Sequence, residues 1–154
     1  MTFSLVARCE HTGMFGVAVA TSSICVGARC PHARAGVGAV ATQNVTDPRL
    51  GTQVLDAMEA GGSAAEAIEA VARERPHMAY RQLIAVDALG HTAQFTGSNT
   101  LGEHAVDQKS DCISAGNLLA TRDVPSAMTA SFTSSCGQHL GERLLAGSRP
   151  NSLC

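Results

Sequence analysis

The sequence has no tryptophan, one tyrosine and four phenylalanines, so aromatic residues make up only 3% of its 154 residues. Proteins that bind single-stranded nucleic acid stack the bases on aromatic side chains, and few such side chains occur here. Lysine is scarce as well, since Lys109 is the only one, and basic residues do not cluster. With a net charge of −2, this composition argues against nucleic acid or an anionic membrane surface as a partner.

Long apolar runs are also missing. No stretch approaches the roughly 20 apolar residues that a transmembrane helix requires. Residues 1–20 alternate between polar and apolar types, whereas a signal peptide has a continuous apolar core. We therefore expect a cytoplasmic protein that does not enter a membrane, with its cysteines reduced.

The six cysteines include no C-x-x-C pair. The nearest approach to metal-ligand spacing is Cys25, Cys30 and His32, and no second pair of ligands accompanies them. We expect no metal site, and we expect the cysteines to pack as small apolar side chains.

Hydrophobic residues make up 45% of the chain, which suffices for one core built from aliphatic side chains. We expect a single domain over residues 1–147. Residues 148–154 have the composition of a loop or a frayed end and are expected to form a C-terminal tail.

Short β-rich segments separated by turn residues predict β-hairpins. A polar turn that ends at Gly13 separates the first two segments, and Ala88-Leu89-Gly90 separates a later pair. A loop over residues 29–34 is expected within the second pair. The predicted strands are residues 4–8 with 15–20, 24–27 with 37–42, 81–87 with 91–96, and 112–116.

Helical periodicity begins at Pro48, where Leu50, Val54 and Met58 recur at every fourth position. Gly61-Gly62 is expected to end this helix, and the capping-box pattern Ser63-Ala64-Ala65-Glu66 to begin another that Pro76 stops. Two further helices are predicted over residues 123–134 and 138–146. The order of strands, helix pair, strands and helix pair favours an α+β fold over a parallel doubly wound sheet.

The glycine-rich run Gly36-Val37-Gly38-Ala39-Val40-Ala41 loosely matches a dinucleotide-binding fingerprint. That fingerprint must follow a strand and open a helix, and turn residues after Thr42 break the pattern. We interpret the run as a glycine-rich strand in a closely packed sheet.

Thr2 becomes the first residue of the chain if Met1 is removed. A threonine hydroxyl needs a base to become a nucleophile, and the free α-amino group of the same residue is a base within reach. Its unperturbed pKa of about 7.7–8.0 suits this role. Many proteins begin with Met-Thr, so an ordinary second residue is the alternative.

The chain resembles an uncharacterised bacterial and archaeal family, the family of unknown function 1028, which is grouped with the N-terminal-nucleophile hydrolases. The resemblance covers nearly the whole chain, and its longest and most specific match is the segment Pro31 to Gln43. The segments that carry the resemblance are residues 2–8, 16–20, 26–28, 31–43, 81–82, 86–88 with Gly90, 95–97, 116–119, 127–128, Phe132 and 142–145.

This resemblance implies a four-layer αββα sandwich, with two antiparallel sheets between helix pairs, and hydrolysis of an amide bond. Thr2 then occupies the position of the nucleophile. The resemblance places five further polar residues near the substrate as clamps or oxyanion donors: Arg34, Thr42, Gln43, Arg81 and Asn117. For Arg34 and Arg81, an equally weighted alternative is a structural role in bonding loop carbonyls.

Two departures from the family pattern bear on activity. Family members usually continue past the last helix pair, so we expect a fold truncated at its C-terminus. Ser22 and Ser23 stand where the family often has a basic residue, which leaves Arg29 or Arg34 to supply a cation near the amine.

The sequence thus predicts an amidohydrolase that acts on a small amide or peptide-like substrate, without a cofactor. The alternative is a non-catalytic binding or assembly module that keeps the fold and has lost turnover. Exposed sheet edges favour a homodimer in either case.

Overall fold

The computed structural model describes residues 1–73 and 75–149. The strands are β1 (Thr2–Arg8), β2 (Phe15–Thr21), β3 (Pro31–Arg34), β4 (Gly38–Asn44), β5 (Arg81–Asp87), β6 (Thr92–Thr96), β7 (Ala105–Lys109) and β8 (Cys112–Asn117). The α-helices are α1 (Pro48–Glu59), α2 (Ala64–Arg73), α3 (Val124–Ser134) and α4 (Leu140–Gly147), with short 3₁₀ turns η1 (Val26–Ala28) and η2 (Met78–Tyr80). The prediction of an α+β fold with antiparallel sheets is confirmed.

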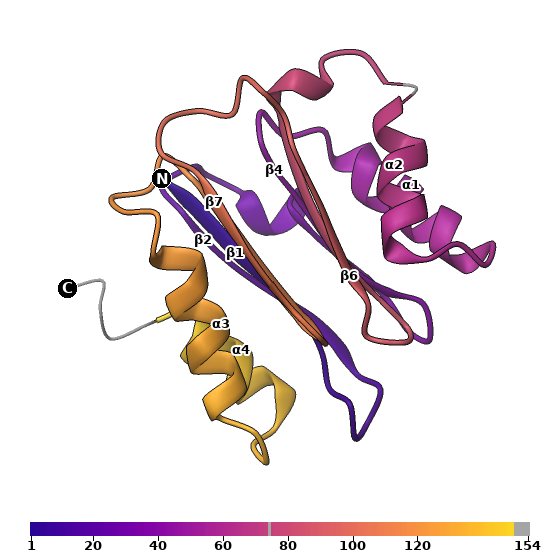
Figure 1. The fold of residues 1–154 in the computed structure, drawn as a ribbon, viewed down its shortest axis with the longest axis vertical. Coiled ribbons are helices and arrows are strands. Elements are labelled where there is room, and N and C mark those ends of the chain that lie inside the picture. Colours follow the sequence, from indigo (N-terminus) through magenta and orange to yellow (C-terminus); the bar gives the residue numbers. More distant parts are fainter. Residues whose placement is uncertain (74, 150–154) are drawn as a thin grey trace.

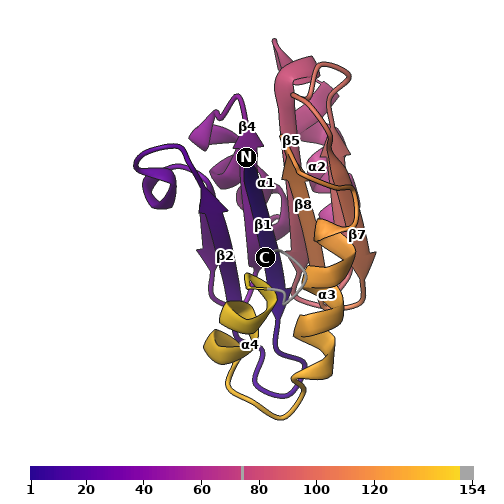
Figure 2. The same cartoon turned by 90° about the vertical axis from the view of Figure 1, so that its left-hand side faces the viewer.

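The strands form two antiparallel four-stranded sheets. One sheet has the order β2-β1-β8-β7, which Figure 2 shows nearly face on, and the other has the order β3-β4-β5-β6. Strand β1 therefore lies inside its sheet, between β2 and β8. The chain brings β8 to β1 from more than a hundred residues away, so the N-terminal strand is held by contacts remote in sequence.

The two sheets face each other, and each carries a helix pair on its outer side (Figure 1). Helices α1 and α2 pack on β4, β5 and β6, whereas α3 and α4 pack on the sheet that contains β1. Apolar clusters fill all three interfaces. The molecule is thus built of four layers in the order helix pair, sheet, sheet, helix pair.

Alternation along the strands divides each strand between two of these interfaces. On β1, Leu5 and Ala7 pack toward α3 and α4, and Val6 packs between the sheets. Small residues such as Ala39, Ala41 and Ala115 line the space between the sheets, which suits a close approach of the two layers. The same alternation determines which polar side chains enter that space.

The predicted start of the first helix pair is confirmed in detail. The Asp47 carboxylate accepts from the Arg49 N–H at 3.1 Å, and Pro48 occupies the first turn of α1, where no N–H is needed. The predicted apolar stripe of Leu50, Val54 and Met58 is buried. At α2 the capping box forms, with Ser63 N–H donating to Glu66 Oε2 at 2.9 Å.

The second predicted hairpin is wrong in its first strand. Residues 24–27 form a turn and part of η1, and Cys25 has a φ of 56°, which extended backbone does not adopt. Strand β3 instead covers Pro31–Arg34, which the sequence predicted as a loop. Because β3 lies at a sheet edge, its proline removes no hydrogen bond that a neighbouring strand needs.

The sequence analysis also missed β7. Its residues Ala-Val-Asp-Gln-Lys have little β-propensity, and the strand is stabilised by pairing with β8. Of the predicted C-terminal tail, Ser148 and Arg149 follow α4 directly, and residues 150–154 lie outside the described residues. No helix in the described ranges is both long and apolar enough to cross a bilayer.

Candidate functional site

Three polar residues form a row across one end of the sheet that contains β1. Thr2 pairs with Thr21 on β2 and with Asn117 on β8. By strand alternation, all three side chains share the face that Val6 turns toward the other sheet. The hydroxyl oxygens of Thr2 and Thr21 lie 2.8 Å apart, so one donates a hydrogen bond to the other. Asn117 is paired directly with Thr2 on the side away from Thr21. The Cβ atoms of residues paired in this way lie about 4.5–5.5 Å apart.

Two glutamines from the other sheet face this row. Gln43 comes from β4 and Gln82 from β5, where they are paired directly. The Gln43 amide donates to Gln82 Oε1 at 2.8 Å and accepts from the Ser4 hydroxyl of β1 at 2.8 Å. Asn117 Nδ2 donates to the same Gln82 oxygen at 3.2 Å. A continuous hydrogen-bonded network therefore joins the two sheets beside Thr2.

Burial makes this network rigid. Ser4 and Gln82 have no exposed surface, and Gln43 and Asn117 are each 2% exposed. A buried amide without a partner costs about 1–3 kcal/mol, so each side chain is held in the orientation that satisfies its donors. Gln82 is the junction, because its oxygen accepts from two amides and its Nε2 donates to the Gly116 carbonyl at 3.3 Å.

Of the six residues predicted for the site, the structure brings Thr2, Gln43 and Asn117 together. Arg34, Thr42 and Arg81 lie elsewhere. The Thr42 side chain faces the α1 side of its sheet, where its hydroxyl donates to the Asp47 carbonyl at 3.3 Å. Arg81 points the same way and donates to the Val45 carbonyl. Because Thr42 and Arg81 each lie one position from an inward-facing glutamine, alternation turns them to the opposite face.

Arg34 is at the far end of β3, opposite Gly38 on β4. Its guanidinium donates to Asp56 at 2.8 Å and to Glu59 at 2.6 Å, both on α1. The hydrogen bond that Arg34 donates to Asp56 is the largest influence that raises the pKa of Arg34, and Glu59 adds to it. Both contacts are with carboxylates of α1, whereas the two roles expected for Arg34 were a contact with the substrate and hydrogen bonds to loop carbonyls.

Three residues near Thr2 were not among the predicted site residues: Ser4 and Gln82, which belong to the network, and Thr21, which contacts Thr2 itself. A signal for them exists in the sequence. Each is a polar residue on the inward face of a strand, and that face also carries apolar residues: Val6 on β1, Val19 on β2 and Ile84 on β5. Polar residues at such positions indicate where the buried face of a strand makes hydrogen bonds in place of apolar contacts.

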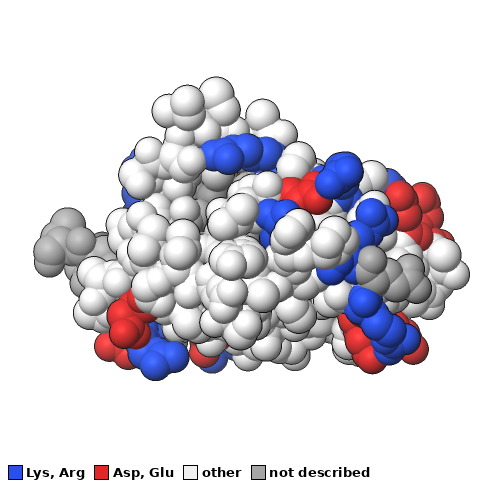
Figure 3. Space-filling model, turned by 90° about the horizontal axis from the view of Figure 1, so that it is seen from above, with Lys and Arg blue, Asp and Glu red and all other residues white. Residues whose placement is uncertain are grey.

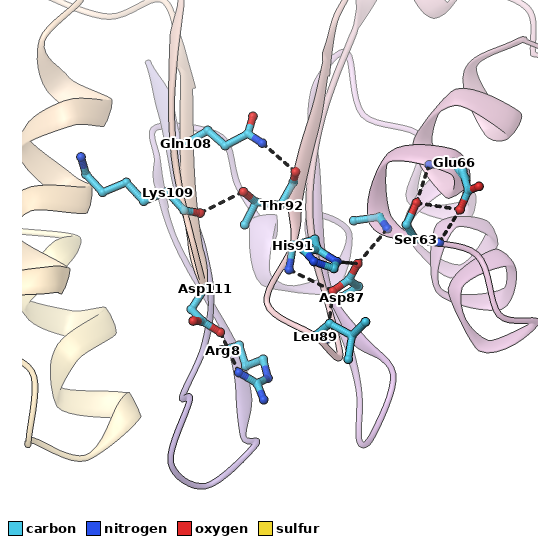
Figure 4. Close-up of polar contacts among 11 residues, drawn as sticks. Arg8, Ser63, Glu66, Asp87, Leu89, His91, Thr92, Gln108, Lys109 and Asp111 are labelled. Atoms are coloured by element: carbon cyan, nitrogen blue, oxygen red, sulfur yellow. Dashed lines mark hydrogen bonds and ion pairs between the residues drawn. The ribbon is translucent and has the colours of Figure 1, made fainter.

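A second polar cluster lies at the opposite end of the sheets and is structural (Figure 4). Asp87 ends β5, and its carboxylate accepts from the N–H groups of Ala64 at 3.2 Å, Leu89 at 2.9 Å and His91 at 3.0 Å. A cleft of about 540 Å³ adjoins it, lined partly by Glu59 and Glu66. Because backbone donors satisfy Asp87, it fixes the turn after β5 and the start of α2.

Within residues 1–73 and 75–149, no three His, Cys, Asp or Glu side chains are close enough to hold a metal ion. Cys25 is exposed, and Cys30 is buried between the sheets. Burial raises the pKa of the Cys30 thiol to about 11, which opposes the thiolate form that binds metals.

The end of the molecule that carries Thr2 has an uncharged centre (Figure 3). Both basic and acidic side chains border this centre. Four apolar side chains near the ends of β1, β4 and β8 are about half exposed: Met1, Val45, Leu101 and Leu118. Leu118 follows Asn117 with a φ of 51°, a strained conformation for a leucine.

The fold defines the class of protein as α+β, with two antiparallel sheets and four helices. A family described as "Family of unknown function (DUF1028)" matches residues 2–149, and the chain belongs to this family. One similar solved structure is the crystal structure of protein SPO2555 from Silicibacter pomeroyi, which is assigned to DUF1028. It shares 34% identity with a TM-score of 0.90, over 96% of this chain and 68% of that one. A search among curated proteins gave no match.

Proposed function

We propose that this protein is an amidohydrolase of the N-terminal-nucleophile type that acts on a small amide or peptide-like substrate. The observation that carries the proposal is the position of Thr2. It is the first residue of an interior strand, it faces the space between two antiparallel sheets, and fixed polar side chains flank it on both sides. The four-layer arrangement supports the same assignment, since helix pairs cover both sheets as that class of hydrolase requires.

In the proposed reaction, the α-amino group of Thr2 is free once Met1 has been removed. This amine takes the hydroxyl proton while Oγ1 bonds to the substrate carbonyl carbon. The C–N bond then breaks, the proton passes to the leaving nitrogen, and an ester on Thr2 remains. Water attacks this ester with the same amine as base, which releases the acid and restores the hydroxyl.

The neighbours of Thr2 have separate parts in this scheme. The Thr21 hydroxyl holds Thr2 Oγ1 in place through the 2.8 Å contact. Asn117 uses one N–H for Gln82, and its second N–H is the donor that we assign to the developing oxyanion. Gln82 acts through Asn117 and is therefore a positioning residue.

The experiment has two stages. Intact-mass measurement and N-terminal sequencing of the purified protein first establish whether the chain begins at Thr2. A β-lactone probe is then added. Attack by Oγ1 opens its ring, the hydroxyl proton ends on the released ring oxygen, and the protein gains the whole mass of the probe.

We expect one probe per chain, located on Thr2, with labelling lost in Thr2→Ala and retained in part in Thr2→Ser. Thr42→Val is the matched control, because it removes a threonine hydroxyl that faces the other side of the second sheet. Labelling that persists in Thr2→Ala, or a chain that keeps Met1 throughout, contradicts the proposal.

A non-catalytic binding or assembly module is the second candidate, and one observation favours it. With Met1 in place, its carbonyl accepts from the Ser22 N–H at 3.3 Å, which prolongs the pairing of β1 with β2. A chain that retains Met1 has no free amine on Thr2. Sedimentation of such a chain tests the homodimer that this candidate predicts, since a monomer at all concentrations counts against assembly.

A further inference from the structure

Arg29 lies in the segment between β2 and β3, directly after η1. The segment is held firmly, because the N–H groups of Arg29 and Cys30 both donate to the Val26 carbonyl, at 3.1 and 3.0 Å. Val26 packs against the apolar cluster between the sheets. Arg29 is half-buried, so its position is fixed by the fold although it belongs to a connecting segment.

A chain of contacts runs from this arginine to Thr2. Arg29 Nη2 donates to the Ser23 hydroxyl at 2.6 Å and to the Ile24 carbonyl at 3.0 Å. The Ser23 N–H donates to Thr21 Oγ1 at 3.1 Å. Thr21 Oγ1 in turn lies 2.8 Å from Thr2 Oγ1. The guanidinium is therefore anchored on the side of Thr2 where β2 ends.

Arg29 differs from several other arginines in its ionic partners. Arg34 at the far end of the sheet contacts two carboxylates, and Arg8 and Arg49 contact one each. No carboxylate contacts Arg29 among the residues that the structure describes, and no hydrogen bond in that range uses its Nε or Nη1. The Nε and Nη1 groups of this cation are thus available on the side of Thr2 where β2 ends.

The Nη1 group of Arg29 can donate charge-assisted hydrogen bonds to a carboxylate, because Nη2 alone is used by Ser23 and Ile24. Because a single arginine supplies the charge, a monoanionic planar group fits better than a phosphate, which proteins usually surround with several donors. We propose that Arg29 binds a carboxylate of the substrate, so that the substrate class is an amide that also carries a carboxylate, as in an N-acyl amino acid. This inference rests on the proposed function, because it takes Thr2 as the nucleophile that attacks the bound amide.

Binding without turnover tests the inference separately from the chemistry. The Thr2→Ala protein is titrated with N-acetylglycine and with its methyl ester, followed by NMR chemical shifts. We expect the acid to bind at least about tenfold more tightly than the ester, since only the acid forms the ion pair. Arg29→Gln should remove this preference by weakening the acid alone, and Arg29→Lys should keep part of it.

Arg34→Gln is the matched control, because it removes an equal charge whose contacts are with α1. Equal affinities for acid and ester, or an acid affinity unchanged by Arg29→Gln, overturn the inference. So does the absence of acid binding up to its solubility limit. A parallel loss of both ligands in Arg29→Gln indicates a structural role for the side chain and also overturns it. Failure of β-lactone labelling at Thr2 contradicts the proposed function and leaves this titration interpretable.

Discussion

Gln82 is the residue on which the buried network depends. Replacing it by leucine removes the acceptor of both Gln43 Nε2 and Asn117 Nδ2, and these donors are buried. We expect Gln82→Leu to lower the free energy of unfolding by about 2–4 kcal/mol, measured by urea denaturation, because each orphaned donor costs about 1–3 kcal/mol.

Gln53→Leu is the control for this substitution. Gln53 Oε1 is buried without a hydrogen-bond partner, so its loss removes no hydrogen bond at that atom. We expect a change below about 1 kcal/mol there. If the two variants are destabilised equally, the network contributes no more than general side-chain packing.

The cysteines provide a second prediction at the scale of single residues. Cys30 and Cys112 are fully buried, and burial raises the pKa of each thiol to about 11. Because the thiolate is the reactive form, we expect iodoacetamide at pH 8 to modify exposed Cys25 and Cys136 long before these two. Peptide mapping with and without denaturant measures the order, and early modification of Cys30 would contradict the packing between the sheets.

At the scale of elements, the start of α2 is stabilised by the Ser63–Glu66 capping box. The Ser63 hydroxyl accepts from the Glu66 N–H at 3.3 Å. We expect Ser63→Ala to destabilise the protein by about 1 kcal/mol, as for other helix caps, measured by thermal or urea unfolding. Ser63→Asp should recover most of the loss, and full stability of Ser63→Ala would show that the cap is dispensable.

The same box makes stability depend on pH. Hydrogen bonds from the Ser63 backbone N–H, and then from its hydroxyl, hold the pKa of Glu66 below its ordinary value. A carboxylate with a lowered folded pKa stabilises the protein above its unfolded pKa, about 4.3, and loses this contribution as the pH falls through the folded value.

Glu66→Gln removes this titration and keeps an acceptor. The variant should therefore be less stable than the wild type at pH 6 and closer to it at pH 3, as measured by urea unfolding at both values. An equal difference at the two pH values would contradict the lowered pKa.

How far the sequence predicts these elements depends on whether local signals are strong. Helices α1 and α2 have caps and apolar periodicity, α3 has a proline in its first turn, and all four helices were predicted near their observed positions. Strand β7 has little β-propensity and no fully buried residue, and β3 contains a proline, so both depend on pairing with a neighbouring strand. At the site, Thr2, Gln43 and Asn117 were predicted to be close, and the faces of Thr42 and Arg81 were not, because a one-residue offset reverses the side chain.

At the scale of the whole molecule, the two sheets are joined by polar contacts at both ends and by apolar packing in between. At the end opposite Thr2, Arg8 Nη1 donates to Asp111 at 2.7 Å, and the Asp111 N–H donates to the Gly90 carbonyl at 2.9 Å. The edge strands meet nearby, where the Thr92 hydroxyl donates to the Lys109 carbonyl at 2.9 Å (Figure 4). The contacts of Asp111 with Gly90 and of Thr92 with Lys109 join the two sheets, whereas the Arg8–Asp111 pair lies within one sheet.

Because the two ends of the sheets are far apart, we predict that a substitution at one end leaves the structure of the other end unchanged. Strand β1 runs from Thr2 to Arg8, a length of about 20 Å at 3.3 Å per residue. Asp111→Asn removes the ion pair with Arg8. Both side chains of this pair are about one fifth exposed, so we expect the free energy of unfolding to fall by about 1 kcal/mol. The amide chemical shifts of Asn117 and of Phe3, which follows Thr2, should stay unchanged, because interior packing confines the adjustment to nearby turns. Lys109→Ala, on the same hairpin, is the control and should change stability less. Shifts at Phe3 or Asn117 in Asp111→Asn that exceed those in the control would mean that the sheets move as one rigid unit, so that the far turns also determine the geometry of the site.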